Sequence, residues 1–166
     1  VDNIAQAEFD TGALSHTVIV GLDYYHSGSL FSGRRDNSPP LIDLFNPVYG
    51  QGLNFGPVAR WDRTLSQTGL YVQDQIKLDK WALVLGGRYD WASVVNKDPV
   101  QDTRFASKDE AFTGRAGLVY LFDNGLAPFV SYSESFLPLT GTDANDKPFD
   151  PSTGNQYEVG VKYQPP

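Results

Sequence analysis

The stretch QTGLYVQDQIKLDKWALVLGGRYDW, residues 67–91, alternates between apolar and polar side chains in two successive runs. Only residues 78–80 separate the two runs, a break that allows a tight hairpin turn and nothing longer. Alternation with a period of two places successive side chains on opposite faces of a strand. The stretch therefore predicts an antiparallel β-hairpin with one apolar face.

The second run of this hairpin carries an aromatic side chain at each end of its apolar face. That face consists of Trp81, Leu83, Leu85, Gly87, Tyr89 and Trp91. A strand of ten residues is about 33 Å long, and a tilt of roughly 40° leaves a height of about 25 Å, the thickness of the apolar band of an outer-membrane barrel. The two tryptophans are therefore spaced like the two aromatic girdles of such a barrel.

The first run follows the same rule with one exception. Its apolar face consists of Thr68, Leu70, Val72, Ile76 and Leu78. Asp74 falls on this face, where a charge in lipid is costly, so we expect a local bulge or a position near the membrane rim. The alternative to a barrel is a half-buried sheet in a soluble sandwich. Strands of soluble proteins average about five or six residues, whereas each of these runs has eleven.

The composition of the chain limits the classes of protein to which it can belong. The chain has 166 residues, of which 40% are hydrophobic, with no cysteine and a net charge of -7. No apolar run approaches the roughly 20 residues of a transmembrane helix, whereas a barrel strand shows lipid an apolar side chain only at every second position. The absence of cysteine removes disulfide and thiol chemistry. The negative charge, without a basic stripe, argues against nucleic acid as a partner.

Alternation recurs outside the hairpin and raises the expected number of strands to seven. The further strands are expected at residues 1–9, 16–26, 111–122, 126–136 and 156–163. Short turns are expected at residues 10–15, 78–80 and 123–125, and long irregular loops at 28–66, 96–110 and 137–155. Short turns on one side and long loops on the other are typical of outer-membrane barrels. Bacterial single-chain barrels have an even number of strands and no open edge in lipid, so we expect a segment of a larger barrel.

Three stretches resemble the barrel of TonB-dependent siderophore receptors, namely TGLYVQDQIKLDKWALVLGGRYDW, GRAGLVYLFDNGLAPFVSYSESFLP and GNQYEVGVKYQP. Within that family the chain is most similar to the ferrichrome and hydroxamate-type receptors. The upstream stretches HTVIVGLDYY and PPLIDLFNPVYG are similar to the same family, so the resemblance covers nearly the whole chain. It implies an all-β fold, in which this chain supplies about seven strands of an antiparallel transmembrane β-barrel of about 22 strands.

The resemblance also implies a function, the TonB-energised uptake of ferric siderophores of the hydroxamate type across the bacterial outer membrane. Residues 1–166 would be part of one barrel domain, without the plug domain and the TonB box of the family. The implied partners are the ferric siderophore as transported ligand, outer-membrane lipid, and TonB through the missing N-terminal region. No cofactor is implied.

The alternative function is the wall of a porin-like or sugar-selective diffusion channel. Such a channel would carry clustered acidic and basic residues on a loop folded into its lumen. The expected loop at 28–66 offers only Arg34, Arg35 and Asp36 close together. The sequence therefore favours the receptor.

Aromatic and polar residues at the extracellular mouth hold the siderophore in these receptors, and the resemblance indicates three substrate-binding candidates. Tyr25 would face the lumen at the top of its strand, and Phe31 and Tyr49 would lie in the long loop. Alternatively, Tyr25 is a girdle or packing residue and the loop aromatics only hold the loop in place. Arg34 and Arg35 could attract an anionic chelate or be merely solvated.

No catalytic or metal site is predicted. A hydrolase needs a base close to its nucleophile, and the only histidines, His16 and His26, lie at opposite ends of one expected strand. The stretch from Asp143 to Lys147 resembles the opening of a calcium loop. It lacks the glycine at the sixth position and has Gly154 where the bidentate glutamate belongs. We therefore expect an ordinary turn there and no enzymatic activity.

Overall fold

A single antiparallel sheet contains all the regular structure of the chain in the computed structural model, which describes residues 1–145 and 147–165. Its strands are β1 (Asp2–Thr11), β2 (Leu14–Gly33), β3 (Ala59–Leu78), β4 (Trp81–Asp98), β5 (Thr103–Tyr120), β6 (Leu126–Leu137) and β7 (Ser152–Tyr163). They follow one another in sequence order across the sheet. The predicted all-β fold with seven antiparallel strands is confirmed. Among the described residues, no helix is long and apolar enough to span a bilayer.

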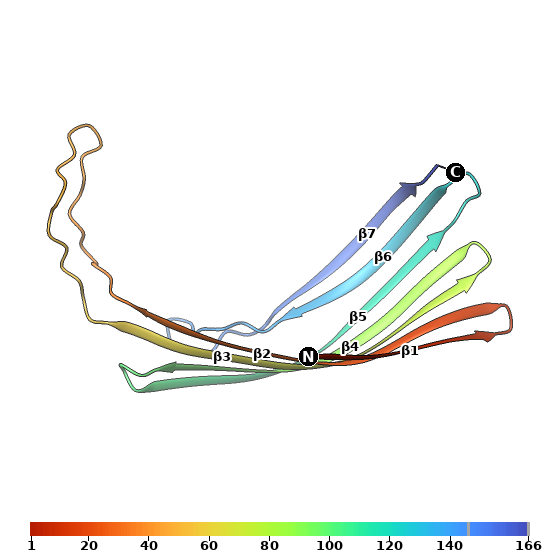
Figure 1. Ribbon diagram of the computed structural model, residues 1–166, viewed down its shortest axis with the longest axis horizontal. Coiled ribbons are helices and arrows are strands. Elements are labelled where there is room, and N and C mark those ends of the chain that lie inside the picture. Colours follow the sequence, from red (N-terminus) through yellow and green to blue (C-terminus); the bar gives the residue numbers. More distant parts are fainter. Residues whose placement is uncertain (146, 166) are drawn as a thin grey trace.

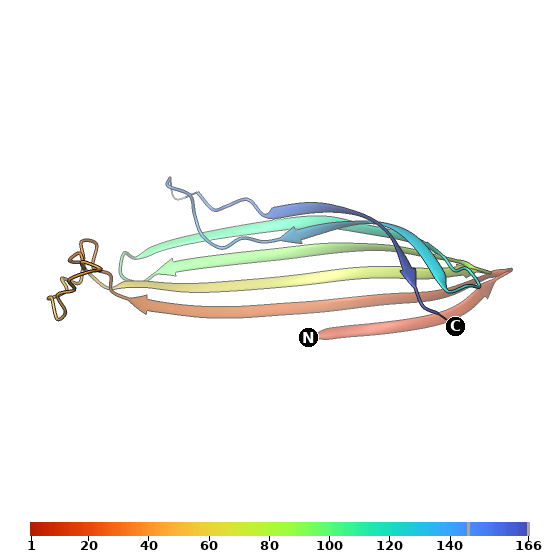
Figure 2. The ribbon, with the colours of Figure 1, turned by 90° about the horizontal axis from the view of Figure 1, so that it is seen from above.

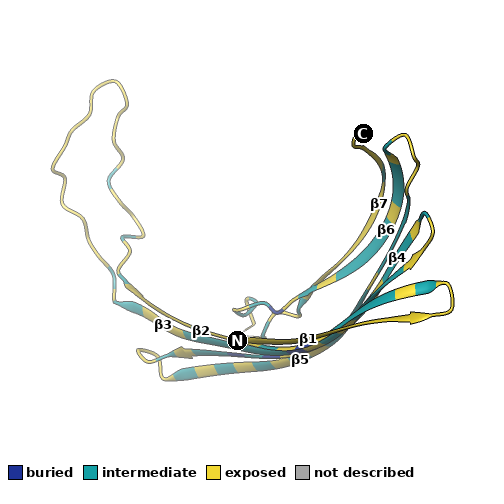
Figure 3. Cartoon of the chain, turned by 45° about the vertical axis from the view of Figure 1, so that its right-hand side comes forward, coloured by how far each residue is buried: buried dark blue, intermediate teal, exposed yellow. Residues whose placement is uncertain are grey.

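The sheet curves like a section of a barrel wall, with β1 and β7 as its two edges (Figure 1). The connections of residues 34–58, 99–102 and 138–151 lie at one end of the strands, and the tight turns of residues 12–13, 79–80 and 121–125 lie at the other end (Figure 2). No second layer covers either face, and most side chains are exposed or half-buried (Figure 3). The described sheet is thus a partial barrel rather than one half of a sandwich.

The hairpin predicted from residues 67–91 is present. Its register runs without interruption from Asp62 opposite Lys97 to Leu78 opposite Trp81. Asp79, the first of the two turn residues, has a φ of 51°, the left-handed conformation that such hairpin turns need. The short turn therefore pairs the apolar positions of β3 with those of β4.

The strand register also assigns each side chain to a face, because residues directly opposite each other in antiparallel strands lie on the same face. Tyr24, Thr68, Trp91 and Glu110 form one row across β2 to β5 on the convex face. This outer face carries exposed apolar side chains along its length, among them Val20, Leu22, Leu70, Val72, Leu85, Val130 and Val159. A continuous uncovered apolar face of this kind fits contact with lipid.

Five strands, β2 to β5 and β7, extend several residues beyond their expected ends. β2 and β3 have 20 residues each, and β4 and β5 have 18, so much of the expected loops at 28–66 and 96–110 is strand. The connections that remain are residues 34–58, 99–102 and 138–151. The expected long second loop is wrong, because β4 and β5 are joined by a four-residue turn. Above the membrane both faces of a strand can be polar, so alternation no longer indicates the strand.

Two further expectations concern single residues. Asp74 lies on the outer face without a bulge, because its neighbours pair in continuous register with β2 and β4. The expected bulge is therefore wrong, and the alternative, a position near the membrane rim, stays a prediction. Instead, His16 Nδ1 lies 2.7 Å from Asp74 Oδ2, and the His16 ring stacks on Phe9 with the centroids 5.0 Å apart. Asp146, within the expected loop at 137–155, lies outside the described residues.

Candidate ligand site at the mouth

The three candidate residues named from the sequence do not meet in one place. Tyr25 and Phe31 both belong to β2 and lie on its concave face, six residues or about 20 Å apart. The expectation that Phe31 lies in a loop is wrong, because β2 continues to Gly33. Tyr49 lies in the connection of residues 34–58, with 80% of its surface exposed.

A hollow of about 430 Å³ lies at the loop end of the concave face. We call it the mouth hollow. Three neighbouring strands, the turn between β4 and β5, and the connection of residues 138–151 line it. Its lining residues include Trp61 and Arg63 of β3, Asn96 and Lys97 of β4, Phe105 of β5, and Thr142 and Phe149 of residues 138–151. The connection therefore reaches over the concave wall as far as β3. This brings together side chains from four separate parts of the chain.

Trp61 is the central aromatic residue of the mouth hollow. The ring of Phe31 stacks on it, with the centroids 4.8 Å apart and the planes inclined by 19°. The guanidinium carbon of Arg63 lies 5.6 Å from the centroid of the Trp61 ring, within the range of a cation–π contact. Trp61 nevertheless keeps 40% of its surface exposed. The structure therefore joins Phe31 to the mouth hollow through Trp61.

Asn96 adds a hydrogen-bonding group to this aromatic surface. Its Oδ1 atom is buried and has no hydrogen-bond partner among the described residues. A buried acceptor without a partner costs free energy. The mouth hollow thus presents the Arg63 guanidinium beside its aromatic rings, with the Asn96 Oδ1 atom buried in its wall.

The connection of residues 138–151 owes its shape to Asp143. The Asp143 carboxylate accepts hydrogen bonds from the backbone N–H groups of Asn145 and Lys147, at 2.8 and 2.9 Å. These donors hold the pKa of the Asp143 carboxyl below its usual value. Thr142 pairs with Pro148 in a single β-bridge that closes a small hairpin. The turn expected in place of a calcium loop is confirmed.

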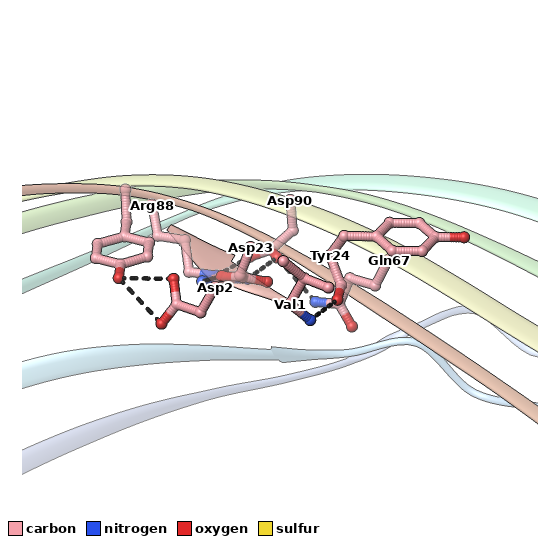
Figure 4. Close-up of polar contacts among 8 residues, drawn as sticks. Val1, Asp2, Asp23, Tyr24, Gln67, Arg88 and Asp90 are labelled. Carbon is pink, nitrogen blue, oxygen red and sulfur yellow. Dashed lines mark hydrogen bonds and ion pairs between the residues drawn. The ribbon is translucent and has the colours of Figure 1, made fainter. Parts of the chain in front are cut away.

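A polar cluster lies further from the mouth on the same concave wall. Its side chains belong to β2, β3 and β4, and Figure 4 shows them pointing toward the side of β6 and β7. Arg88 donates hydrogen bonds to Asp90 at 2.7 and 2.8 Å and to Asp23 at 3.1 Å. Gln67 donates a further bond to Asp90 at 2.8 Å. Asp90 is only 3% exposed. We call these four residues the Arg88 cluster.

Alternation within each strand does not connect the members of the Arg88 cluster, which strand pairing brings together. The sequence feature that indicates the Arg88 cluster is Gly69, which lies opposite Asp90 in the register. A Cβ atom at Gly69 would overlap the Arg88 guanidinium, so only glycine leaves room for Arg88 to lie flat against the wall. Trp61, Asn96, Phe105 and Phe149 were also missed as a group, since they become neighbours only through strand pairing and loop folding.

Comparison with known proteins places the fold in a family. Residues 1–166 match the family described as TonB dependent receptor-like, beta-barrel. The chain is 44% identical to the ferrioxamine B receptor of Salmonella typhimurium strain LT2, over 100% of this chain and 24% of that protein. It is 42% identical to the ferrichrome outer membrane transporter/phage receptor of Escherichia coli K12, over 99% of this chain and 23% of that protein. The chain thus spans about a quarter of the length of these curated relatives.

Solved structures with the same arrangement of strands are more distant in sequence. The ferric-catecholate import receptor Fiu of Escherichia coli K12 matches with a TM-score of 0.78 and 18% identity, over 98% of this chain and 28% of that one. The siderophore receptor PiuA of Acinetobacter baumannii matches with a TM-score of 0.72 and 22% identity, over 98% of this chain and 28% of that one. At these identities the likeness establishes the fold alone.

The family consists of transport receptors of the bacterial outer membrane and not of enzymes, in agreement with the expected absence of a catalytic site. The soluble sandwich considered as an alternative fold is therefore excluded. An apolar convex face, a polar concave wall and long strands in sequence order are the features of a barrel segment. The chain belongs to the TonB-dependent receptor-like β-barrel family and forms part of a barrel wall in the bacterial outer membrane.

Proposed function

We propose that this chain supplies part of the wall and of the extracellular mouth of a receptor that imports ferric siderophores of the hydroxamate type, with energy delivered through TonB. The observation that carries the proposal is the mouth hollow, where Trp61 and Phe105 stand beside the Arg63 guanidinium. The relatives named for ferrioxamine B and ferrichrome support the same class of ligand. Residues 1–166 would act as a segment of a barrel of about 22 strands, together with a plug domain and a TonB box elsewhere in the whole protein.

The chemistry of the mouth hollow suits a bulky metal chelate. Aromatic rings offer a large contact area at a small cost in conformational entropy, and the few polar groups among them set the orientation of the ligand. Arg63 would meet electronegative oxygens of the chelate. The ferric ion would remain enclosed in its chelate as cargo.

The diffusion channel is the less well supported function. Its constriction would need free charges on a loop, and Asp36 is engaged within its own connection. The Asp36 carboxylate accepts hydrogen bonds from the backbone N–H groups of Ser38 and Asn54, at 2.9 and 2.7 Å. It thus ties together the two ends of the connection of residues 34–58.

A ligand titration of the full-length receptor in detergent tests the proposed function. We expect tryptophan fluorescence to be quenched saturably by a ferric hydroxamate at submicromolar concentration, weakly by a ferric catecholate, and not by a neutral oligosaccharide. Quenching by the catecholate alone would show that the receptor binds catecholate rather than hydroxamate siderophores. Ion conductance in planar bilayers without saturable binding of any chelate would establish the diffusion channel instead.

Replacement of Tyr25 by alanine tests the residues assigned to the site. We propose Tyr25, Phe31 and Tyr49 as ligand contacts, with Phe31 acting beside Trp61. The Tyr25→Ala variant is expected to bind the ferric hydroxamate about tenfold more weakly, because an aromatic contact of about 1.4 kcal/mol is lost. Tyr24→Ala is the matched control, because Tyr24 is the neighbouring residue of β2 and faces outward. Equal affinity of the two variants in isothermal titration would remove Tyr25 from the site.

A further inference from the structure

The charged side chains that line the mouth hollow are mainly cationic. Arg63 of β3 and Lys97 of β4 are positively charged, and Asp98 carries the one negative charge among the described lining residues. The Asp98 carboxylate accepts hydrogen bonds from the backbone N–H groups of Val100 and Gln101 in the turn after β4, at 2.8 and 3.0 Å. The mouth hollow is therefore positively charged, in a chain whose net charge is -7.

The positive charge of Arg63 is not neutralised by a neighbour in the sheet. In the register Arg63 lies between Ser29 of β2 and Asn96 of β4, both of which have uncharged side chains. No ion pair within residues 1–145 and 147–165 includes Arg63 or Lys97. Arg63 is half-buried but lines an open hollow, so a ligand can reach its guanidinium. A half-buried charge without a counter-ion costs free energy, which an anionic group of a bound ligand would recover.

The guanidinium of Arg63 is suited to one kind of anionic group. Its planar fork of N–H donors pairs with the two oxygens of a carboxylate through two parallel hydrogen bonds. The contact with Trp61 holds this fork beside an aromatic surface, on which the carbon chain of a carboxylate group can pack. We propose that the mouth hollow binds a carboxylate group on the periphery of the ferric siderophore, with Arg63 as its direct partner and Lys97 adding to the attraction.

This inference rests on the proposed function and narrows its ligand to hydroxamate chelates that carry a free carboxylate. The chain spans about a quarter of the length of its curated relatives, so the mouth hollow forms one part of the mouth and meets one side of the ligand. In a ferric hydroxamate the hydroxamate oxygens surround the metal ion, whereas the pendant groups point outward. The mouth hollow therefore contacts pendant groups, and its positive charge discriminates among them by their charge.

A matched series of ligands, made from one linear ferric trihydroxamate with a terminal amine, tests the proposal. The free amine is positively charged, its N-acetyl derivative is neutral, and its N-succinyl derivative carries a carboxylate. Affinities are measured by isothermal titration of the full-length receptor in detergent at neutral pH. We expect the succinyl derivative to bind about fivefold more tightly than the acetyl derivative, and the free amine about threefold more weakly, as for partly exposed ion pairs.

Variants of Arg63 assign the preference to this residue. Arg63→Gln should bring the affinities for the succinyl and acetyl derivatives to within about twofold of each other, because the carboxylate loses its direct partner. Arg63→Lys keeps the charge without the fork of donors and should retain part of the preference. Arg115→Gln is the matched control, since Arg115 lies on the same concave face, ten residues or about 33 Å along β5 from Phe105. This variant should keep the full preference.

The ligand series separates a failure of this proposal from a failure of the proposed function. Equal affinity for all three chelates would overturn the proposal and leave the proposed function standing, whereas absence of binding by all three would refute both. A preference that persists in Arg63→Gln, or that Arg115→Gln abolishes equally, would also overturn the proposal. If Arg63→Gln does not fold in detergent, Arg63→Lys must show a smaller preference than the wild type, and an unchanged preference would refute the proposal.

Discussion

Replacement of Arg88 by glutamine is expected to lower the free energy of unfolding of the full-length receptor by about 3 kcal/mol. Arg88 is the cation between two carboxylates, and Asp90 is 3% exposed. Without the guanidinium, Asp90 keeps one hydrogen bond from Gln67 and Asp23 loses its cationic partner. Removal of the cation costs more than the pair itself contributes, because the Asp90 carboxylate stays buried without its charged partner. Denaturant unfolding in detergent, followed by tryptophan fluorescence, measures the change.

Arg115→Gln is the matched control for this prediction. Arg115 also lies on the concave face of the neighbouring strand β5, but it hydrogen-bonds the neutral side-chain oxygen of Gln73 and, within the described part of the chain, no carboxylate. We expect a loss below about 1 kcal/mol for this variant. The double variant R88Q/D90N should recover part of the stability, because the buried charge of Asp90 is removed with its partner. If both arginine variants lose the same free energy of unfolding, the Arg88 cluster stabilises the protein no more than the Arg115 hydrogen bond does.

Replacement of Trp61 by alanine is expected to weaken binding of the ferric hydroxamate by about 30-fold, or about 2 kcal/mol. The ring of Trp61 is the surface on which Phe31 stacks and beside which Arg63 is held. Its removal takes away an aromatic contact and also leaves Phe31 and Arg63 without the ring that they contact. Isothermal titration of the full-length receptor measures the affinity without relying on a tryptophan signal.

Trp91→Ala provides the control of the same residue type. Trp91 lies on the outer face and is 44% exposed there, a position suited to the membrane interface. This variant should lose stability in the membrane and keep its affinity for the chelate. If Trp61→Ala and Trp91→Ala bind equally well, the mouth hollow is not where the ligand binds.

The membrane-spanning part of the fold could be predicted because its signal is local. A strand between lipid and lumen alternates with a period of two, and Trp81 and Trp91 mark the limits of the alternation within eleven residues. The strand extensions could not be predicted in this way. Residues 93–98 and 103–110 face a polar environment on both sides, so their pairing is visible only in the register between β4 and β5.

The candidate site depended even more on distant parts of the chain. Tyr25 could be assigned to the concave face from its own strand, and that assignment agrees with its pairing with Gln67. Phe31 was expected in a loop, whereas it belongs to β2 and stacks on Trp61, 30 positions away in sequence. The partner of Asp74 could not be predicted from the local sequence either, because His16 is 58 residues away.

The sequence by itself determined the all-β class, the seven strands, the two faces of each strand and the family, because alternation and family motifs are properties of contiguous residues. Only the tertiary structure decided which side chains share a site. Strand register brings together Arg88 and Asp23, and the folding of residues 138–151 over the wall brings Phe149 to Trp61. These contacts join residues that are far apart in the chain, and no local pattern of side chains encodes the register that joins them.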